Sequence, residues 1–441
     1  MFLGSFIVFF FISRTLIIES PENPSHNSNP ILATNKEPLE LQTIPDLKND
    51  FIRTQKSFLE VNLPAKKVRL YQDGKPIREA PILAAGDPQG WGGSAIGLYK
   101  IISGNKISFS VVAEVYMPYA LHYYGKYYLH GEPYYPGGEK FISSVSGGCI
   151  RLSDKDAKDI YELAELDMPV LVIDKENDDY KYSNEKLSDF PEISARNYLA
   201  ADLNSGFVFA KKNSKKQLPI ASLAKLMTAV VVAENVDLRK SILVKPEMLE
   251  AEGAVQGLEA GKSFRPVELF YPLLIESSND AAEVLSGFLG RKITIEMMQE
   301  KAKAILMENT QFVDPDGFDI SNVSTARDLF QLGRYILNNR PPLLEITKGD
   351  KVQSFGEVSF EIQGLQNKNI FSEDPNFVGG MTGSLLESKY NALFIFKFLA
   401  YNEKIRNVAI ILLGSEDIKT DTQKIYKWLQ DNYRLSPAIK N

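Results

Sequence analysis

Cys149 is the only cysteine in a chain of 441 residues, and it follows two glycines. A lone cysteine cannot form an intrachain disulfide, so its presence needs another reason. Most free cysteines behave as small buried apolar residues. Here, however, His130 precedes Cys149 in the same segment, and an imidazole can take the proton of a thiol and make it nucleophilic. The pair therefore predicts acyl transfer through a cysteine.

The residues around this pair could complete such a site. Gly147 and Gly148 carry no side chain, so we expect their N–H groups to point at a developing oxyanion. The second ring nitrogen of His130 could bond to the carbonyl of Gly131, which would orient the ring without an acidic third residue. Arg151 could bind a substrate carboxylate.

A second group of residues suits a serine nucleophile. Ser222 and Lys225 lie one helical turn apart on the same face, and a desolvated lysine can act as the base for a serine. This spacing alone is common by chance. Ser277-Ser278-Asn279 and Gly379-Gly380-Met381-Thr382-Gly383 follow it along the chain, and that order of three elements is typical of penicillin-binding serine enzymes.

The first group lies in a segment rich in short strands. Aromatic and β-branched residues dominate from residue 58 to 173, and Gly125-Lys126 reads as the turn of a hairpin. His122 lies in that hairpin, where a structural role and a role in the site are equally open. Ser153 is expected to cap one helix. We therefore predict a mostly β domain over residues 55–174, followed by a charged linker over 175–192.

The second group lies in a mixed α and β pattern over residues 193–434. Strands at both ends enclose several helical stretches, which predicts an α/β or α+β domain with a helical insertion. The helix that begins at Ser222 has few polar positions, so it should be buried. The expected elements are strands around the turn 204–206, the helix 222–234, strands 392–396 and 408–413, and a final helix 422–433.

The N-terminus and the composition limit the partners. Residues 1–18 are nearly all apolar, which indicates an export signal or a membrane anchor, and residues 19–50 have the composition of a flexible tether. The net charge of −6 argues against a nucleic acid as the partner, because such binding needs a positively charged surface. No His, Cys or carboxylate cluster has ligand spacing, so we expect no metal, nucleotide or haem cofactor.

Residues 58–173 resemble the L,D-transpeptidases, the enzymes that crosslink peptidoglycan through a cysteine acyl-enzyme. The resemblance is carried by Cys149-Ile150-Arg151-Leu152-Ser153, by Trp91 to Tyr99, and by Met117-Pro118-Tyr119 before the strand that bears His130. It implies a mostly β sandwich with Cys149 as nucleophile and His130 as base. The chain departs from the family at Gly147, where the family has a histidine.

Residues 198–415 resemble the D-alanyl-D-alanine carboxypeptidases. The resemblance rests on Pro219-Ile220-Ala221-Ser222, Asp314-Pro315-Asp316-Gly317 and Ser324-Thr325-Ala326. It implies a sandwich similar to penicillin-binding proteins and serine β-lactamases, with a helical insertion, and β-lactams as covalent inhibitors. The roles it implies are as follows: Ser222 is the acylated nucleophile, Lys225 its base, Ser277 a proton relay, Asn279 a contact to the substrate amide, and Thr382 with Gly383 the strand edge of the pocket.

Met381 is the second departure, because that family has a lysine there beside the substrate carboxylate. Retained carboxypeptidase activity is therefore open. The leading hypothesis is an exported, membrane-tethered enzyme that acts on peptidoglycan stem peptides, in which the serine domain trims a pentapeptide to the tetrapeptide that Cys149 uses as acyl donor. One alternative is a serine carboxypeptidase with an inactive cysteine domain. The other is a non-catalytic scaffold that binds peptidoglycan with two degenerate sites.

Overall fold

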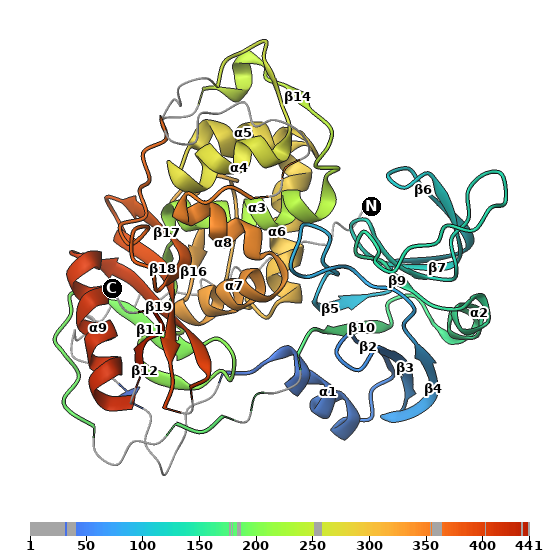
Figure 1. Cartoon of the computed structure of the whole chain (residues 1–441), viewed down its shortest axis with the longest axis horizontal. Coiled ribbons are helices and arrows are strands. Elements are labelled where there is room, and N and C mark those ends of the chain that lie inside the picture. The colour runs from blue at the N-terminus through green and yellow to red at the C-terminus, as the bar shows by residue number, and fades with distance from the viewer. Residues whose placement is uncertain are drawn as a thin grey trace, which may run out of the picture.

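The computed structural model shows two halves that follow each other along the chain (Figure 1). It describes residues 31–32, 41–175, 178, 180–182, 187–250, 258–352, 354, 364–401, 403–433 and 435–439. The predicted anchor over residues 1–18 and most of the predicted tether lie outside these ranges. Within them, no helix is both long enough and apolar enough to cross a membrane.

The N-terminal half contains two sheets. One has five strands in the order β4-β3-β2-β10-β5, and the other has four in the order β6-β7-β8-β9. The elements are α1 (Ile44–Arg53), β2 (Phe58–Asn62), β3 (Lys67–Gln72), β4 (Lys75–Pro81), β5 (Gly97–Lys100), β6 (Ser103–Ser110), β7 (Val115–Tyr124), β8 (Tyr127–His130), β9 (Ile150–Arg151), α2 (Asp154–Leu163) and β10 (Pro169–Ile173). The predicted hairpin around Gly125-Lys126 is confirmed, and Ser153 caps α2 by accepting from the N–H of Asp156.

Helix α1 begins inside the stretch for which the sequence predicted a flexible tether. Thr43 and Asp46 form a capping box at its start, which satisfies N–H groups that the first turn leaves unpaired. Phe51 then packs its ring edge against Phe58, with centroids 5.2 Å apart. Local capping and one aromatic contact therefore hold this part of the tether as a helix on the N-terminal half.

The C-terminal half is built on a seven-stranded sheet. Its order is β1-β12-β11-β19-β18-β17, with β20 also paired to β18. The strands are β1 (Ile31–Leu32), β11 (Asn197–Asp202), β12 (Val208–Lys212), β17 (Phe377–Leu385), β18 (Lys389–Leu399), β19 (Ile405–Ser415) and β20 (Ser436–Pro437). Two short pairs join β13 (Leu218–Pro219) to β16 (Val323–Ser324) and β14 (Ile242–Leu243) to β15 (Ser263–Phe264).

Helices cover both faces of this sheet (Figure 1). Along β18, Leu393 and Ile395 join the apolar core shared with α7, while Phe394 and Phe396 join the core shared with α9, as the two-residue period of a strand requires. The helices are the 3₁₀ helices η1 (Ala221–Leu223) and η2 (Pro246–Met248), and α3 (Ala224–Asn235), α4 (Pro266–Ile275), α5 (Asn279–Gly287), α6 (Arg291–Ala304), α7 (Ala326–Asn339), α8 (Pro341–Lys348) and α9 (Ile418–Tyr433).

The predicted order of two domains and the mixture of sheets with helices are confirmed. Helix α3 is buried as its composition predicted, since only Asn235 among its residues keeps appreciable exposure. The halves are not separated by solvent, because one apolar cluster runs through both of them. Trp91 of the N-terminal half stacks on Phe270 of the C-terminal half, with centroids 5.5 Å apart.

Three charged side chains without exposed surface meet at this boundary. Lys301 Nζ lies 2.7 Å from Glu234 Oε2, and Arg340 Nη2 lies 3.1 Å from Glu234 Oε1. Burial alone would raise the pKa of Glu234, but Lys301 and Arg340 outweigh it and hold the pKa below its usual value. Glu234 is therefore ionised, and its charge is compensated within the C-terminal half.

The same two cations also bind groups of the N-terminal half. Lys301 Nζ donates to the hydroxyl of Tyr99 at 2.7 Å. Arg340 Nη2 donates to the carbonyl of Gly93 at 2.9 Å and to the hydroxyl of Tyr127 at 3.0 Å. We name Glu234, Lys301 and Arg340 the interdomain ion cluster. Because the cations of this cluster also donate to the N-terminal half, the halves should not separate without breaking hydrogen bonds to buried charged groups.

Replacing Arg340 with Met should destabilise the protein strongly. The change leaves Glu234 with one cation and removes the donor to Gly93 and Tyr127, so we expect a loss of about 3–5 kcal/mol in the free energy of unfolding. Urea denaturation followed by circular dichroism measures it.

Arg239→Met is the matched control for this prediction. Arg239 also reaches the N-terminal half, at the carbonyl of Val112, but its side chain is 56% exposed. Its loss should therefore cost at most about 1 kcal/mol. If both arginine variants lowered the free energy of unfolding by the same amount, burial of the ion cluster would not be the cause of the large loss expected for Arg340→Met.

Candidate functional site

Cys149 lies directly before β9, which runs parallel to β8. The register pairs Leu129 with Ile150 and His130 with Arg151. Opposite residues of a parallel pair point to the same face, and side chains alternate along each strand. His130, Arg151 and Cys149 therefore lie on one face of the sheet, as the predicted nucleophile and base require.

The thiol of Cys149 is held by the turn between β7 and β8. Its Sγ donates to the carbonyl of Lys126 at 3.6 Å. Burial raises the pKa of the thiol, although the N–H of Tyr128 and the charges of Lys126 and Arg151 act in the opposite direction. Cys149 is therefore a thiol at neutral pH in this conformation, and it needs a base before it can attack.

His130 is suited to be that base. Its Nδ1 donates to the carbonyl of Gly131 at 2.6 Å, as predicted, so the free acceptor of the neutral ring is Nε2. Burial lowers the pKa of His130 to about 4, which keeps the ring neutral at pH 7. Among the described residues Cys149 makes no hydrogen bond to His130, and the thiol must turn from Lys126 toward the ring to use it.

One expectation for the glycines is wrong. The N–H of Gly148 is not free for an oxyanion, because it donates to Ser146 Oγ at 3.0 Å. The role of Gly148 is steric: its φ is +114°, and a Cβ there would lie 2.2 Å from the ring of Tyr127. Only glycine fits that conformation and that approach. Gly147, by contrast, has no heavy atom within 4 Å of the place where a Cβ would stand, so the position could accept a side chain without a clash.

Two other predicted residues are already engaged with the protein. Arg151 donates to the carbonyl of Ser143 at 2.9 Å and stacks over Phe141, so a substrate carboxylate would have to share it. His122 Nε2 donates to the carbonyl of Gly125 at 2.7 Å. The ring of His122 therefore supports the β7–β8 turn, which favours the structural role for this histidine.

The serine group is assembled as the sequence predicted. Lys225 Nζ lies 3.0 Å from Ser222 Oγ, 2.6 Å from Asn279 Oδ1 and 2.6 Å from the carbonyl of Asp316. Burial lowers the pKa of Lys225, which has no exposed surface, while the nearby aspartates oppose the shift. An amine with a lowered pKa beside a hydroxyl is the arrangement that activates a serine.

A cavity of about 510 Å³ opens over this group. Its lining includes five residues predicted from the sequence, which are Ser222, Ser277, Asn279, Thr382 and Gly383. Segments far apart in the chain thus meet at one place: η1, the loop before α5, and β17. A cavity of this size is in the range of ligand sites.

The backbone around Ser222 is tightly constrained. Ala221 has a φ of +52° and Ser277 a φ of +59°, which is unusual for residues with a Cβ and costs energy that packing must supply. A Cβ at Gly317 would lie 2.0 Å from the carbonyl of Ala221, and one at Gly383 would lie 2.8 Å from the N–H nitrogen of Ser222. Two glycines therefore allow the strained nucleophile segment to fit between its neighbours.

Met381, which stands where the carboxypeptidase family has a lysine, points into the protein interior. Met381 is 1% exposed and packs in the apolar core. Sequence reasoning missed Lys368, which lines the same cavity as Ser222 and Thr382 and whose charge lowers the pKa of Lys225. Lys368 lies outside the three predicted elements, so no local pattern marked it. The N–H of Lys368 donates to the carbonyl of Ile275 at 2.9 Å, which fixes its backbone beside α4.

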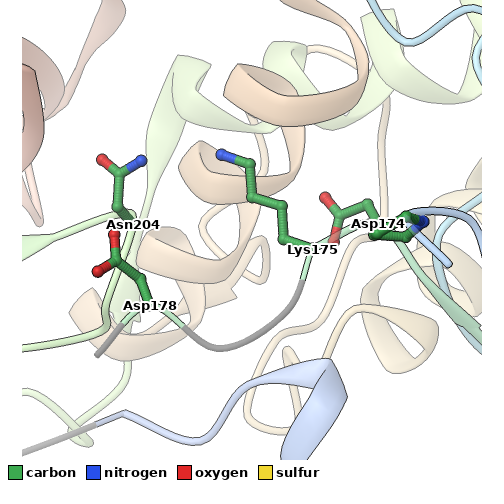
Figure 2. Close-up of a pocket in the computed structure, with 5 residues that line it drawn as sticks. Asp174, Lys175, Asp178 and Asn204 are labelled. Atoms are coloured by element: carbon green, nitrogen blue, oxygen red, sulfur yellow. The ribbon is translucent and has the colours of Figure 1, made fainter. Parts of the chain in front are cut away.

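A separate cleft of about 350 Å³ lies where the chain leaves the N-terminal half (Figure 2). It is lined by Pro64, Asp174, Lys175, Asp178 and Asn204. Lys175 donates to Asn338 at 2.8 Å, and Asp178 pairs with Arg406 at 2.7 Å. The lining contains no serine or cysteine, and Lys175 and Asp178 already have partners, so this cleft offers less for acyl transfer than the other two sites.

Proteins with curated functions resemble the C-terminal half. The chain is 30% identical over 197 residues to the D-alanyl-D-alanine carboxypeptidase DacB2 of Mycobacterium tuberculosis. The matched region covers 44% of this chain and 67% of the relative. It is also 26% identical over 246 residues to a D-alanyl-D-alanine endopeptidase of Pseudomonas aeruginosa. This matched region covers 54% of this chain and 78% of the relative.

A solved structure has the same fold. The crystal structure of a D-alanyl-D-alanine carboxypeptidase from Mycobacterium tuberculosis matches with a TM-score of 0.50 and 25% identity. The match covers 58% of this chain and 98% of that one. The shared fold therefore extends over the whole of the solved chain.

Family models match both halves. The model described as L,D-transpeptidase catalytic domain matches residues 56–172, and the model described as D-alanyl-D-alanine carboxypeptidase matches residues 184–412, more than half of the chain. These ranges contain Cys149 with His130 and Ser222 with Lys225, respectively. The chain therefore belongs to the D-alanyl-D-alanine carboxypeptidase family of serine peptidases and carries an L,D-transpeptidase catalytic domain before the serine domain.

Proposed function

We propose that the protein modifies peptidoglycan stem peptides outside the cytoplasm with two acyl-transfer sites. The cysteine site crosslinks by L,D-transpeptidation, and the serine site removes a terminal D-alanine. The proposal uses domain bounds of 55–174 and 193–434, joined by a linker over 175–192. An export signal or membrane anchor over residues 1–18 is part of the proposal and lies outside the described residues.

At the cysteine site, the thiol of Cys149 attacks the carbonyl between the third and fourth residues of a tetrapeptide stem. Its proton passes to Nε2 of His130 and then to the amine of the departing D-alanine. An acceptor amine attacks the thioester, the new amide forms, and the thiol is restored. The neutral ring that burial gives His130 at pH 7 supports its role as the first proton acceptor.

At the serine site, the hydroxyl of Ser222 attacks the last peptide bond of a pentapeptide. Neutral Lys225 takes the proton, which then reaches the departing D-alanine, while Ser277 relays it and Asn279 contacts the substrate amide. Water hydrolyses the ester and releases a tetrapeptide. That product is the donor for Cys149, so the two reactions form a sequence. A β-lactam, which presents a reactive amide to the same serine, would acylate Ser222.

The observation that carries the proposal is the distance of 3.0 Å between Lys225 Nζ and Ser222 Oγ, inside a cavity that also presents Asn279 and Thr382. A degenerate scaffold would have no need to keep a buried amine beside a hydroxyl, because burying an ammonium is costly. This observation favours the enzyme over the scaffold.

Cys149→Ala and Ser222→Ala should separate the two activities. We expect Cys149→Ala to abolish crosslinking and loss of the fourth stem residue, and Ser222→Ala to abolish loss of the fifth. Each variant should leave the other reaction intact, because each removes only one nucleophile. Purified protein is incubated with tetrapeptide and pentapeptide stems, and mass spectrometry follows products and protein adducts.

Each outcome of this experiment has a meaning. Loss of the fifth residue without any thiol-dependent product would support the serine carboxypeptidase with an inactive cysteine domain. Stem-peptide binding without turnover by the folded parent protein would support the scaffold and sink the proposal.

Lys368 is proposed to supply the positive charge that Met381 lacks. It lines the cavity with Ser222 and Thr382, and its ammonium has no ion-pair partner within the described part of the chain. The neighbouring Asn369 is 2% exposed and donates to the carbonyls of Leu274 and Thr347. The backbone is thus fixed while the side chain stays available to a substrate carboxylate.

Lys368→Met should lower kcat/KM for a pentapeptide by about 10–100-fold, because a charge-assisted hydrogen bond contributes about 1.5–3 kcal/mol. A pentapeptide amide, which lacks the terminal charge, should be cleaved equally by parent and variant.

Lys303→Met is the matched control, because it removes the same charge from the exposed side of α6. Its kcat/KM should not change. An unchanged value for Lys368→Met, with pentapeptide still cleaved, would reject the role of Lys368 and leave the carboxypeptidase proposal standing.

A further inference from the structure

The turn between β7 and β8, residues 124–127, connects the cysteine site to the serine half. The carbonyl of Lys126 accepts from Cys149 Sγ at 3.6 Å. Nζ of the same lysine donates at 3.2 Å to the carbonyl of Val236, at the C-terminal end of α3. The group that holds the thiol is therefore itself held by the other half of the chain.

The other residues of the β7–β8 turn also contact the serine half. The hydroxyl of Tyr124 accepts from Asn235 Nδ2 at 3.3 Å. A Cβ at Gly125 would lie 1.8 Å from Asn235 Oδ1, so the turn approaches the end of α3 as closely as glycine allows. The hydroxyl of Tyr127 accepts from Arg340 at 3.0 Å. Each residue of the turn thus meets the serine half.

Arg340 also fixes the other side of the nucleophile. The residue before Cys149 is Gly148, and a Cβ there would lie 2.2 Å from the ring of Tyr127 and 3.1 Å from the carbonyl of Gly93. Arg340 donates to both of those groups. The buried guanidinium of Arg340 therefore fixes the two groups, Gly93 and Tyr127, between which Gly148 packs directly before Cys149.

We infer that the serine domain is a structural part of the cysteine site, with Asn235, Val236 and Arg340 as positioning residues for Cys149. Ser222 chemistry takes no part in this role. Lys225 and Asn235 lie at opposite ends of α3, about 15 Å apart at 1.5 Å per residue, so the two reactions occupy separate ends of one buried helix. The activity readout rests on the proposed function, whereas the thiol readout does not.

The thiol readout is specific because Cys149 is the only cysteine. Its alkylation by iodoacetamide as a function of pH gives an apparent pKa for one group. The titratable and charged groups that face Cys149 come from β7, from the β7–β8 turn with β8, and from β9. They are Tyr123, Lys126, Tyr127, Tyr128, His130 and Arg151. Because burial is the largest cause of the raised pKa, loosening the turn should bring the pKa down.

The test uses the full chain with Tyr127→Phe, which removes only the acceptor for Arg340. We expect the apparent pKa of Cys149 to fall by about one unit, with roughly tenfold faster alkylation at pH 7. Crosslinking should fall at least about tenfold, because small misplacements of a reacting atom are costly. Asn235→Ala should act in the same direction. Removal of D-alanine at Ser222 should stay within about twofold of the parent.

Tyr335→Phe is the matched control. Its hydroxyl donates to Glu234 and accepts from Lys301 at the same boundary, but among the described residues it makes no hydrogen bond to the β7–β8 turn. It should destabilise the boundary and leave the alkylation profile of Cys149 unchanged, as should Ser222→Ala. An unchanged profile in Tyr127→Phe, or equal shifts in Tyr335→Phe, would overturn the inference. Absent crosslinking in the parent would instead overturn only the proposed function.

Discussion

The interdomain ion cluster is the constraint on which the rest of the arrangement depends. Glu234, Lys301 and Arg340 have no exposed surface, and charges buried to this degree are tolerated only when each is paired and hydrogen-bonded. Their hydrogen bonds to the N-terminal half go to Tyr99, to Tyr127 and to the carbonyl of Gly93. The N-terminal half therefore completes the solvation of charges that belong to the C-terminal half. The two family domains thus share one buried cluster of charges and hydrogen bonds.

This arrangement has different consequences for the two sites. The serine group is self-contained, because Ser222, Lys225 and Asn279 come from η1, α3 and α5 of one half. The cysteine site is not, because the turn that holds its thiol is bonded to the end of α3. Helix α3 thus carries the amine proposed as a base at its start and a contact to the cysteine site at its end. The end of α3 therefore joins the serine half to the turn that holds the thiol of Cys149.

The sequence predicted much of the fold and most of the serine site because those signals are local. The hairpin at Gly125-Lys126, the buried helix from Ser222 and the late strands follow from spacing and turn chemistry. The sandwich descriptions and the domain bounds stay predictions. The free N–H of Gly148 was wrong because Ser146 Oγ competes for it, and such a contact depends on loop conformation. Arg340 could not be found, since its partners Gly93 and Tyr127 lie more than two hundred residues away. Lys368 could not be found, since it lies outside the three sequence elements of the serine group.

Burial is the largest cause of the pKa shifts at both sites. The thiol of Cys149 has a raised pKa and the imidazole of His130 a lowered one, so both are neutral near pH 7. A neutral pair exchanges a proton only when substrate brings sulfur and ring nitrogen together, which limits unwanted oxidation or alkylation of a lone cysteine. Lys225 is tuned by the same desolvation, with Lys368 adding to the shift. An incoming carboxylate that neutralised Lys368 would remove part of that shift, so substrate binding and the basicity of Lys225 are coupled through one exposed lysine.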